Sequence, residues 1–282
     1  MALQDIHVTG AARIAPAPSE LKPARWALRP ARLARMDRLC ALALVAADAA
    51  LLDAGIDVAA WRGERVAVVV GSAFGCHATN EQYYRGLLTE GPRGASPRLF
   101  AYTLPSSPVG EISIHYVARG PLETLVSGRH AGVEAVARAA RLCDAALADV
   151  AIAVAVETGS ALLTSLGHAV VDGAAAVVIE RGATARERGA CLRAEVRGAG
   201  SSFHAGDPAN ASTAAGGAAL AEAGLPASTQ RLPIPPDAGA VAAVATLAAW
   251  LLGGGDDAPV SLAVSDEAGG AAAIALVPSG AR

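Results

Sequence analysis

The fold is decided by residues Leu122–Glu157, LETLVSGRHAGVEAVARAARLCDAALADVAIAVAVE. This stretch predicts a strand, a tight turn, an apolar helix and a second strand. Small residues at Ser127, Gly128 and Gly132 let the turn present Arg129 at the N-terminus of the helix, where backbone N–H groups and the helix dipole favour negative charge. In many enzymes this position holds a nucleophile. What the chain does therefore depends on the role of Arg129.

The composition narrows the class of protein. The 282 residues, 53% of them hydrophobic, are enough to bury a core without disulfides or a structural metal. A formal net charge of −3 argues against nucleic-acid binding, which needs clustered Lys and Arg to neutralise phosphates. The four cysteines are far apart and form no CxxC pair, so the sequence predicts neither a metal site nor a disulfide framework, and a reducing cytoplasm is expected. No cofactor-binding motif is recognised, because GSAFG at Gly71–Gly75 lacks the dinucleotide glycine pattern.

No signal peptide or membrane span is expected. The first residues lack a basic segment followed by an apolar run. The longest uncharged apolar run, Ala238–Gly255, is rich in Gly and Ala and is marginal for a bilayer, which needs about 20 strongly apolar residues. We interpret it as a buried helix.

Elements on either side of the central stretch alternate between helix and strand. Helical spacing is seen over Ala31–Gly55 and Val109–Val117, with a further helix start over Thr79–Leu88. Continuous apolar runs predict buried strands at Arg65–Val70 and Gly173–Arg181, the latter antiparallel to its neighbour because only a short link precedes it. The class is therefore α/β with layered packing.

The C-terminal part resembles a reduced copy of the N-terminal part. We expect a strand at Leu192–Gly200, helices at Ser212–Gly224 and Ala238–Leu252, and a closing strand pair at Val260–Val264 and Ala271–Val277. This pattern predicts two related halves, residues 1–184 and a shortened half, residues 185–282.

The residues alone leave several chemistries open. Arg129 cannot be acylated, because its guanidinium stays protonated, but it can hold a carboxylate or phosphate or form a salt bridge at a subunit contact. Ser127 and Cys76 are alternative nucleophiles for an acyltransferase or hydrolase. Isolated histidines such as His115 and His168 are more often surface or core residues than catalysts.

The ordered motifs resemble the β-ketoacyl synthases of fatty acid and polyketide synthesis. The resemblance is carried by VAVVVGSAFG, GPRGASP, LPSSPVGEISI and RGP between residues 65 and 121, by GVEAVARAARLCDAALADVAIAVAVET, by ARERGACLRAEVRGAGSSFHA, and by the closing SDEAGGAAAIALV. It covers nearly the whole chain. It implies a thiolase-like αβαβα arrangement of two βαβ-type halves, here with the second half reduced.

The departures from the family pattern concern its catalytic residues. Where catalytic members have T-A-C-A-S-G, this chain has Ser127 to Gly132, with Arg129 at the cysteine position. The family's H-G-T-G-T is missing, and Pro233–Ala243, in place of its G-H-x-x-G-A-A-G turn, holds no histidine. The chain is also shorter than the family between Leu163 and Asp172. The resemblance therefore implies no catalytic residue and no condensing activity.

This pattern resembles the chain-length factors, non-catalytic partners of type II ketosynthases. The resemblance implies a heterodimer with an active ketosynthase, contacts with an acyl carrier protein through that complex, and an acyl tunnel that this chain helps to shape. It places Phe100, Tyr102 and Leu104 at the tunnel wall, and Leu125, Ser127, Arg129 and His130 at or near the subunit contact. A scaffold that only binds an acyl carrier protein is a further alternative.

Overall fold

The computed structural model describes residues 2–15, 17, 21, 30–57, 61, 63–234, 239–254 and 258–279. Nine strands in this part of the chain form one sheet in the order β3-β2-β4-β5-β1-β6-β9-β8-β7. The strands are β1 (Ile6–Ile14), β2 (Val66–Ser72), β3 (Leu122–Val126), β4 (Val150–Glu157), β5 (Gly173–Arg181), β6 (Ala194–Phe203), β7 (Gln230–Arg231), β8 (Val260–Ser265) and β9 (Gly270–Pro278).

Two halves of this sheet are joined at one point. In the first half, β2 is parallel to both β3 and β4, and β5 is antiparallel to β4 as predicted. In the second half, β9 is antiparallel to both β6 and β8. The junction is a short antiparallel pairing between β1 and β6, at His7 with Glu195 and Val8 with Ala194.

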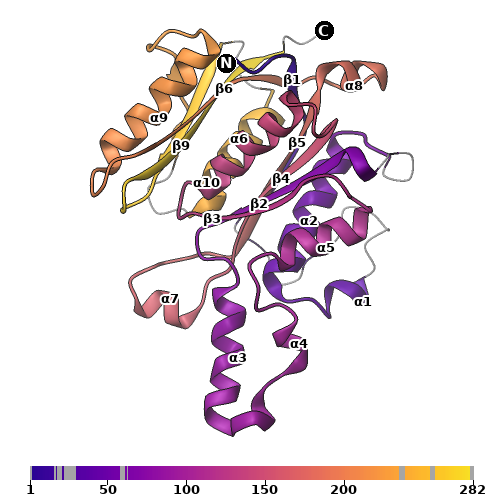
Figure 1. Cartoon of the computed structure of the whole chain (residues 1–282), viewed down its shortest axis with the longest axis vertical. Coiled ribbons are helices and arrows are strands. Elements are labelled where there is room, and N and C mark those ends of the chain that lie inside the picture. The colour runs from indigo at the N-terminus through magenta and orange to yellow at the C-terminus, as the bar shows by residue number, and fades with distance from the viewer. Residues whose placement is uncertain are drawn as a thin grey trace.

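The helices complete five layers (Figure 1). Helices α2 (Arg38–Asp53) and α5 (Ser107–Tyr116) cover the outer face of the first half of the sheet. The central layer is formed by α6 (Ala131–Asp144) and α10 (Ala240–Leu252), which contact strands of both halves. Helix α9 (Pro208–Ala223) covers the outer face of the second half. The predicted layered α/β, thiolase-like architecture with a reduced second half is therefore confirmed.

An arm projects from this body. It consists of α3 (His77–Glu90), the short 3-10 helix η2 (Gly91–Gly94) and α4 (Pro97–Phe100), and Figure 1 shows it extending away from the sheet. The other short elements are α1 (Pro30–Leu33), η1 (Gly63–Arg65), α7 (Ala161–Ser165) and α8 (Gly182–Glu187).

The structure corrects the prediction of one continuous helix over Ala31–Gly55. The chain leaves the helical path after α1, and α2 begins at Arg38 with Asp37 as its N-cap, whose side chain accepts from the N–H of Cys40. The other oxygen of the same carboxylate accepts from the hydroxyl of Thr79. A buried capping residue thus fixes both the start of α2 and the start of the arm.

The predicted segments of the second part are present as β6, α9, α10, β8 and β9, with ends shifted by a few residues. Residues 235–238, which include the beginning of the predicted helix Ala238–Leu252, lie outside the described residues. The division into halves at residue 184 stays a prediction. No described helix is long and apolar enough to cross a membrane.

Candidate functional site

The turn at the end of β3 has the predicted form. Gly128 has a φ of +82°, a conformation that glycine adopts without strain. Arg129 follows, and α6 begins at Ala131 with His130 in the N-cap position. Arg129 therefore lies between a strand end and a helix N-terminus, as the sequence predicts.

The turn between β8 and β9 packs directly against this elbow. The Asp266 side chain accepts from the N–H of Gly270 at 2.9 Å, and its Oδ2 lies 3.1 Å from Nδ1 of His130. The second contact is at ion-pair distance but is not aligned as a hydrogen bond. A side chain at Gly270 would overlap the His130 ring, and one at Gly128 would overlap the Asp266 carboxylate. A side chain at either position would therefore displace the Asp266 carboxylate or the His130 ring from its place.

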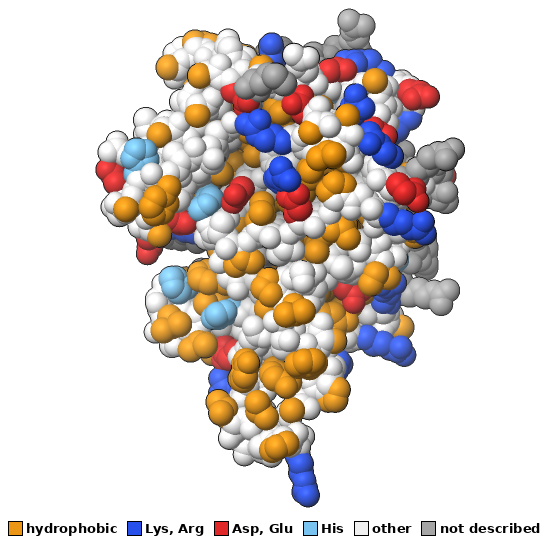
Figure 2. All heavy atoms as spheres, in the orientation of Figure 1, with side chains coloured by type: hydrophobic (Ala, Val, Ile, Leu, Met, Phe, Trp, Pro, Cys, Tyr) orange, Lys and Arg blue, Asp and Glu red, His pale blue; other side chains and the backbone are white. Residues whose placement is uncertain are grey.

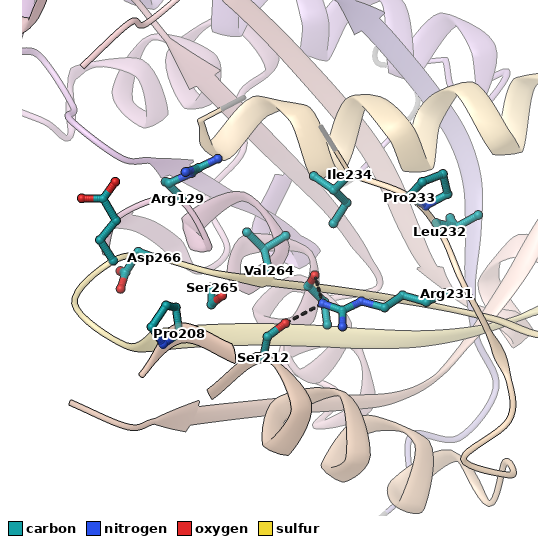
Figure 3. A pocket seen from close by; sticks show the side chains of 12 residues that line it. Arg129, Pro208, Ser212, Arg231, Leu232, Pro233, Ile234, Val264, Ser265 and Asp266 are labelled. Atoms are coloured by element: carbon teal, nitrogen blue, oxygen red, sulfur yellow. Dashed lines mark hydrogen bonds between the residues drawn. The ribbon is translucent and has the colours of Figure 1, made fainter. Parts of the chain in front are cut away.

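Two pockets adjoin at the elbow, and Arg129 lines both. The strand-end pocket, of about 350 Å³, lies at the ends of β2 and β3 and is lined by Ala73, Phe74, Gly128, Arg129, Gly167, His168, Ala169, Val170, Gly239, Asp266, Glu267 and Ala268. The second-half pocket, of about 480 Å³, is lined by Arg129, Pro208, Ser212, Arg231, Leu232, Pro233, Ile234, Ala263, Val264, Ser265, Asp266 and Glu267 (Figure 3).

The guanidinium of Arg129 is uncommitted. Among the described residues it has no hydrogen-bond or ion-pair partner. A free guanidinium offers five N–H donors to a ligand or to a partner subunit. The salt bridge at a subunit contact that was considered from the sequence stays a prediction.

Two features of the strand-end pocket were not found from the sequence. The rings of Phe74 and His168 lie 4.9 Å apart and form part of its wall, so His168 is not an isolated histidine. Behind the wall lies Glu157, the last residue of β4, whose carboxylate accepts from the N–H of Ala73 and whose Oε2 has no partner among the described residues. Burial raises the pKa of Glu157 to about 7. The sequence did carry a signal for Glu157, because it is an acidic residue at the end of a continuous apolar strand.

Neither alternative nucleophile, Ser127 or Cys76, lines a pocket together with Arg129. The hydroxyl of Ser127 donates to Oε2 of Glu134 at 2.5 Å, and Ser127 lines neither pocket that Arg129 lines. The thiol of Cys76 is buried, points at the carbonyl oxygen of Thr103 at 3.0 Å, and has its pKa raised by burial. A raised pKa keeps the thiol protonated and weakens it as a nucleophile.

The predicted tunnel residues line none of the pockets described above. Phe100 and Leu104 are 63% and 64% exposed near the base of α4. Tyr102 is half-buried, and its hydroxyl donates to Glu111 at 3.2 Å. Burial, together with this carboxylate, raises the pKa of Tyr102 to about 12. Leu125 packs against the core between the two halves. A tunnel wall at Phe100, Tyr102 and Leu104 would therefore need a second chain to complete it.

The described residues were also compared with the requirements of a metal site. Among the residues that the structure describes, no group of three His, Cys, Asp or Glu side chains is placed to hold an ion.

The layers and the elbow together define a thiolase-like protein. Residues 7–177 match the family model described as β-ketoacyl synthase, N-terminal domain. Because this match covers more than half of the chain, the chain belongs to the β-ketoacyl synthase family.

Curated relatives agree with this family. The chain is 29% identical over 212 residues to the tetracenomycin polyketide synthase ketoacyl synthase alpha subunit of Streptomyces glaucescens, which is 64% of this chain and 50% of that protein. It is also 29% identical over 204 residues to 3-oxoacyl-[acyl-carrier-protein] synthase 2 of Staphylococcus aureus, 62% of this chain and 51% of that protein. The chain thus spans about half the length of the curated relatives it matches.

Solved structures show the same fold. The ishigamide ketosynthase/chain length factor superposes with a TM-score of 0.82 at 20% identity, over 98% of this chain and 100% of that chain. A type II polyketide acyl carrier protein in complex with its ketosynthase bound to the hexaketide gives a TM-score of 0.79 at 19% identity, over 96% and 99% of the two chains.

Proposed function

We propose that this chain is a non-catalytic, chain-length-factor-like subunit that pairs with an active β-ketoacyl-acyl carrier protein synthase and shapes its acyl tunnel. The observation that carries the proposal is Arg129, which occupies the nucleophile position of an intact elbow. A guanidinium cannot form the thioester on which condensation depends. The fold that this chain shares with the ishigamide ketosynthase/chain length factor supports the same assignment.

The edge of the sheet supports pairing with another subunit. Strand β3 is the terminal strand of the described sheet, so one side of its backbone is unpaired. Leu122 and Val126 on this strand are 43% and 47% exposed. A second subunit that adds a strand here would bury both side chains and complete the backbone hydrogen bonds.

The arm adds an apolar surface to this edge. Tyr84, Leu88, Phe100 and Leu104 are all more than half exposed, and Figure 2 shows hydrophobic side chains gathered on the lower part of the molecule, where the arm lies. A cluster of exposed large apolar residues is typical of an interaction surface. In the proposed heterodimer the partner covers it, and Phe100 and Leu104 reach the tunnel.

Co-expression with an active type II ketosynthase tests the pairing. We expect the two chains to co-purify, and Val126→Asp to abolish the complex because it places a charge on the unpaired edge. Leu147→Asp is the matched control, since Leu147 is 54% exposed in the loop before β4 and away from β3. A chain that stays alone in the presence of the ketosynthase would falsify the heterodimer, and a complex equally weakened by both changes would reject β3 as the contact.

Product analysis tests the tunnel. Phe100→Ala and Leu104→Ala are expected to shift the chain length made by the complex, since each removes apolar volume from the proposed wall. Tyr102→Phe, which removes only the hydroxyl bonded to Glu111, is expected to leave it unchanged. Unaltered product length in all three variants contradicts the tunnel role and leaves the pairing intact.

One observation favours a second candidate, an acyltransferase or hydrolase that uses Ser127. The hydrogen bond from Ser127 to Glu134 is the contact expected of a hydroxyl beside a general base. Incubation with acyl thioesters and intact-mass analysis separates the candidates. The chain-length-factor proposal predicts no acyl adduct, whereas an adduct lost in Ser127→Ala establishes the enzyme.

A further inference from the structure

The second-half pocket is a site whose lining combines apolar and cationic groups. Figure 3 shows Val264 and Ile234 projecting into it between Arg129 and the guanidinium of Arg231. Leu232 and Val264 are buried core residues, so this part of the lining is fixed. A volume of about 480 Å³ is within the range of pockets that hold small organic ligands.

The two arginines are held differently. One terminal nitrogen of Arg231, Nη2, donates to the hydroxyl of Ser212 on α9 and to the carbonyl oxygen of Ala263 on β8, at 2.7 Å for the latter. These bonds fix the Arg231 side chain across the floor of the pocket. Arg129, in contrast, has all of its N–H donors free among the described residues. Arg129 is therefore the group with unused capacity for an anion, and Arg231 adds positive charge nearby.

Two carboxylates also line the pocket and must be accounted for. Oδ1 of Asp266 accepts from the N–H of Gly270, and its Oδ2 lies 3.1 Å from Nδ1 of His130, so this carboxylate faces the elbow. Glu267 is exposed to solvent, which screens its charge. The two arginines and two carboxylates of the lining balance in formal charge. An anion is therefore held only by direct contact with a guanidinium. Such contacts are strong and geometrically specific for carboxylates and phosphates.

We propose that this pocket binds an amphipathic anion, with its carboxylate or phosphate against Arg129 and its hydrocarbon chain over Val264 and Ile234. The site lies within a single chain and needs no partner subunit. The proposal is therefore independent of the heterodimer and of tunnel shaping, and it stands or falls on measurements with this chain alone.

Calorimetric titration of the full 282-residue chain tests it with four probes: decanoate, decyl phosphate, decanol and decyltrimethylammonium. We expect decanoate or decyl phosphate to bind at least about tenfold more tightly than decanol and the cation, because a charge-assisted hydrogen bond is lost in the neutral probe. The tighter of the two anions identifies the head group. Equal binding of all four probes, or binding of none, overturns the proposal.

Variants locate the site. Arg129→Gln is expected to weaken binding of the preferred anion about tenfold or more. Ile234→Asp, which places a carboxylate in the chain region, should also weaken it. Arg98→Gln on α4 is the matched control, since it removes an exposed arginine remote from the pocket, and it should have no effect. Equal weakening by Arg98→Gln and Arg129→Gln places the anion elsewhere and rejects this site. If Arg129→Gln does not fold, the probe series on the unaltered chain still decides the question.

Discussion

The carboxyl group of Glu157 is buried away from solvent, and its Oε2 has no hydrogen-bond partner among the described residues. It is 1% exposed at the end of β4, and one of its oxygens accepts from the N–H of Ala73. Burial disfavours the charged form more than hydrogen bonding from Ala73, Ser72 and Phe74 favours it, so the pKa of Glu157 is raised from an ordinary value of 4.5 to about 7. Near neutral pH this residue therefore exists as a mixture of acid and carboxylate.

This shift predicts a pH-dependent stability. Because the folded state holds the proton more tightly than the unfolded state, the stabilisation is fully present below about pH 4.5 and is lost as the pH rises through about 7. The loss is roughly 3 kcal/mol, since one pKa unit corresponds to about 1.4 kcal/mol. Glu157→Gln, which stays neutral, should remove this slope in urea-unfolding free energies measured between pH 5 and pH 8.

Glu187→Gln provides the control, because Glu187 is exposed on α8 and has no comparable burial. It should leave the pH dependence of the unfolding free energy as it is in the unaltered chain. A slope that persists in Glu157→Gln would show that another group titrates in this range.

The sequence predicts those site residues whose position is set by neighbouring residues in the chain. It does not predict those whose role comes from contacts between distant segments. Arg129 could be identified because the strand, turn and helix around it are contiguous. His130 could be named, but its contact with Asp266 could not, because the two are brought together only by packing of α6 against the β8–β9 turn. Arg231 carried no signal, since its importance comes from crossing to Ser212 and Ala263.

Among the elements, α6 and α10 owe their close packing to Gly132. A side chain at this position would overlap the carbonyl oxygen of Ala240 and would approach Cβ of Ala155 to 3.0 Å. Gly132 thus lets the first turn of α6 lie against the start of α10. Both helices were predicted from their apolar residues, but their contact was not, because periodicity says nothing about which helices meet.

Gly132→Ala is accordingly expected to lower the free energy of unfolding by about 1–3 kcal/mol, as overpacking does in close-packed cores. Gly217→Ala on α9 is the matched control, because no atom lies within 4 Å of its added Cβ. There the better helix propensity of alanine should raise stability by up to about 1 kcal/mol. Urea unfolding measures both changes, and a Gly132→Ala protein as stable as the unaltered chain would contradict the close contact.

For the whole molecule, the central layer makes the two predicted halves dependent on one another. Helix α10 follows residue 184, yet it contacts β1, β4 and β5 of the first half. The core between the halves includes Val177 and Ile179 from β5 and Val244 and Leu247 from α10. Cutting the chain after residue 184 would therefore uncover an apolar face of the first half of the sheet.

A fragment of residues 1–184 is expected not to fold on its own. It should show strong binding of the dye ANS and poor dispersion of amide NMR signals, as states with exposed apolar surface do. The 282-residue chain is the comparison under the same conditions. A well-dispersed spectrum and a cooperative unfolding transition for the fragment would instead identify an autonomous domain.

The layered architecture could be anticipated from the alternation of helices and strands and from the resemblance to a known family. The joining of the two half-sheets through β1 and β6 could not, because it depends on only two residue pairs near the ends of those strands. Pairings this short leave no pattern in the sequence that distinguishes them from solvent-facing strand ends.

The fit between the elbow and the β8–β9 turn also restricts how this protein can change. Gly270 leaves the space that the His130 ring fills, and Gly128 leaves the space for Asp266. A cysteine at position 129 would stand beside His130, whose Nδ1 lies 3.1 Å from Oδ2 of Asp266. Because Arg129 and Asp266 line the same two pockets, a substitution in the β8–β9 turn alters the surroundings of Arg129 without changing the elbow itself.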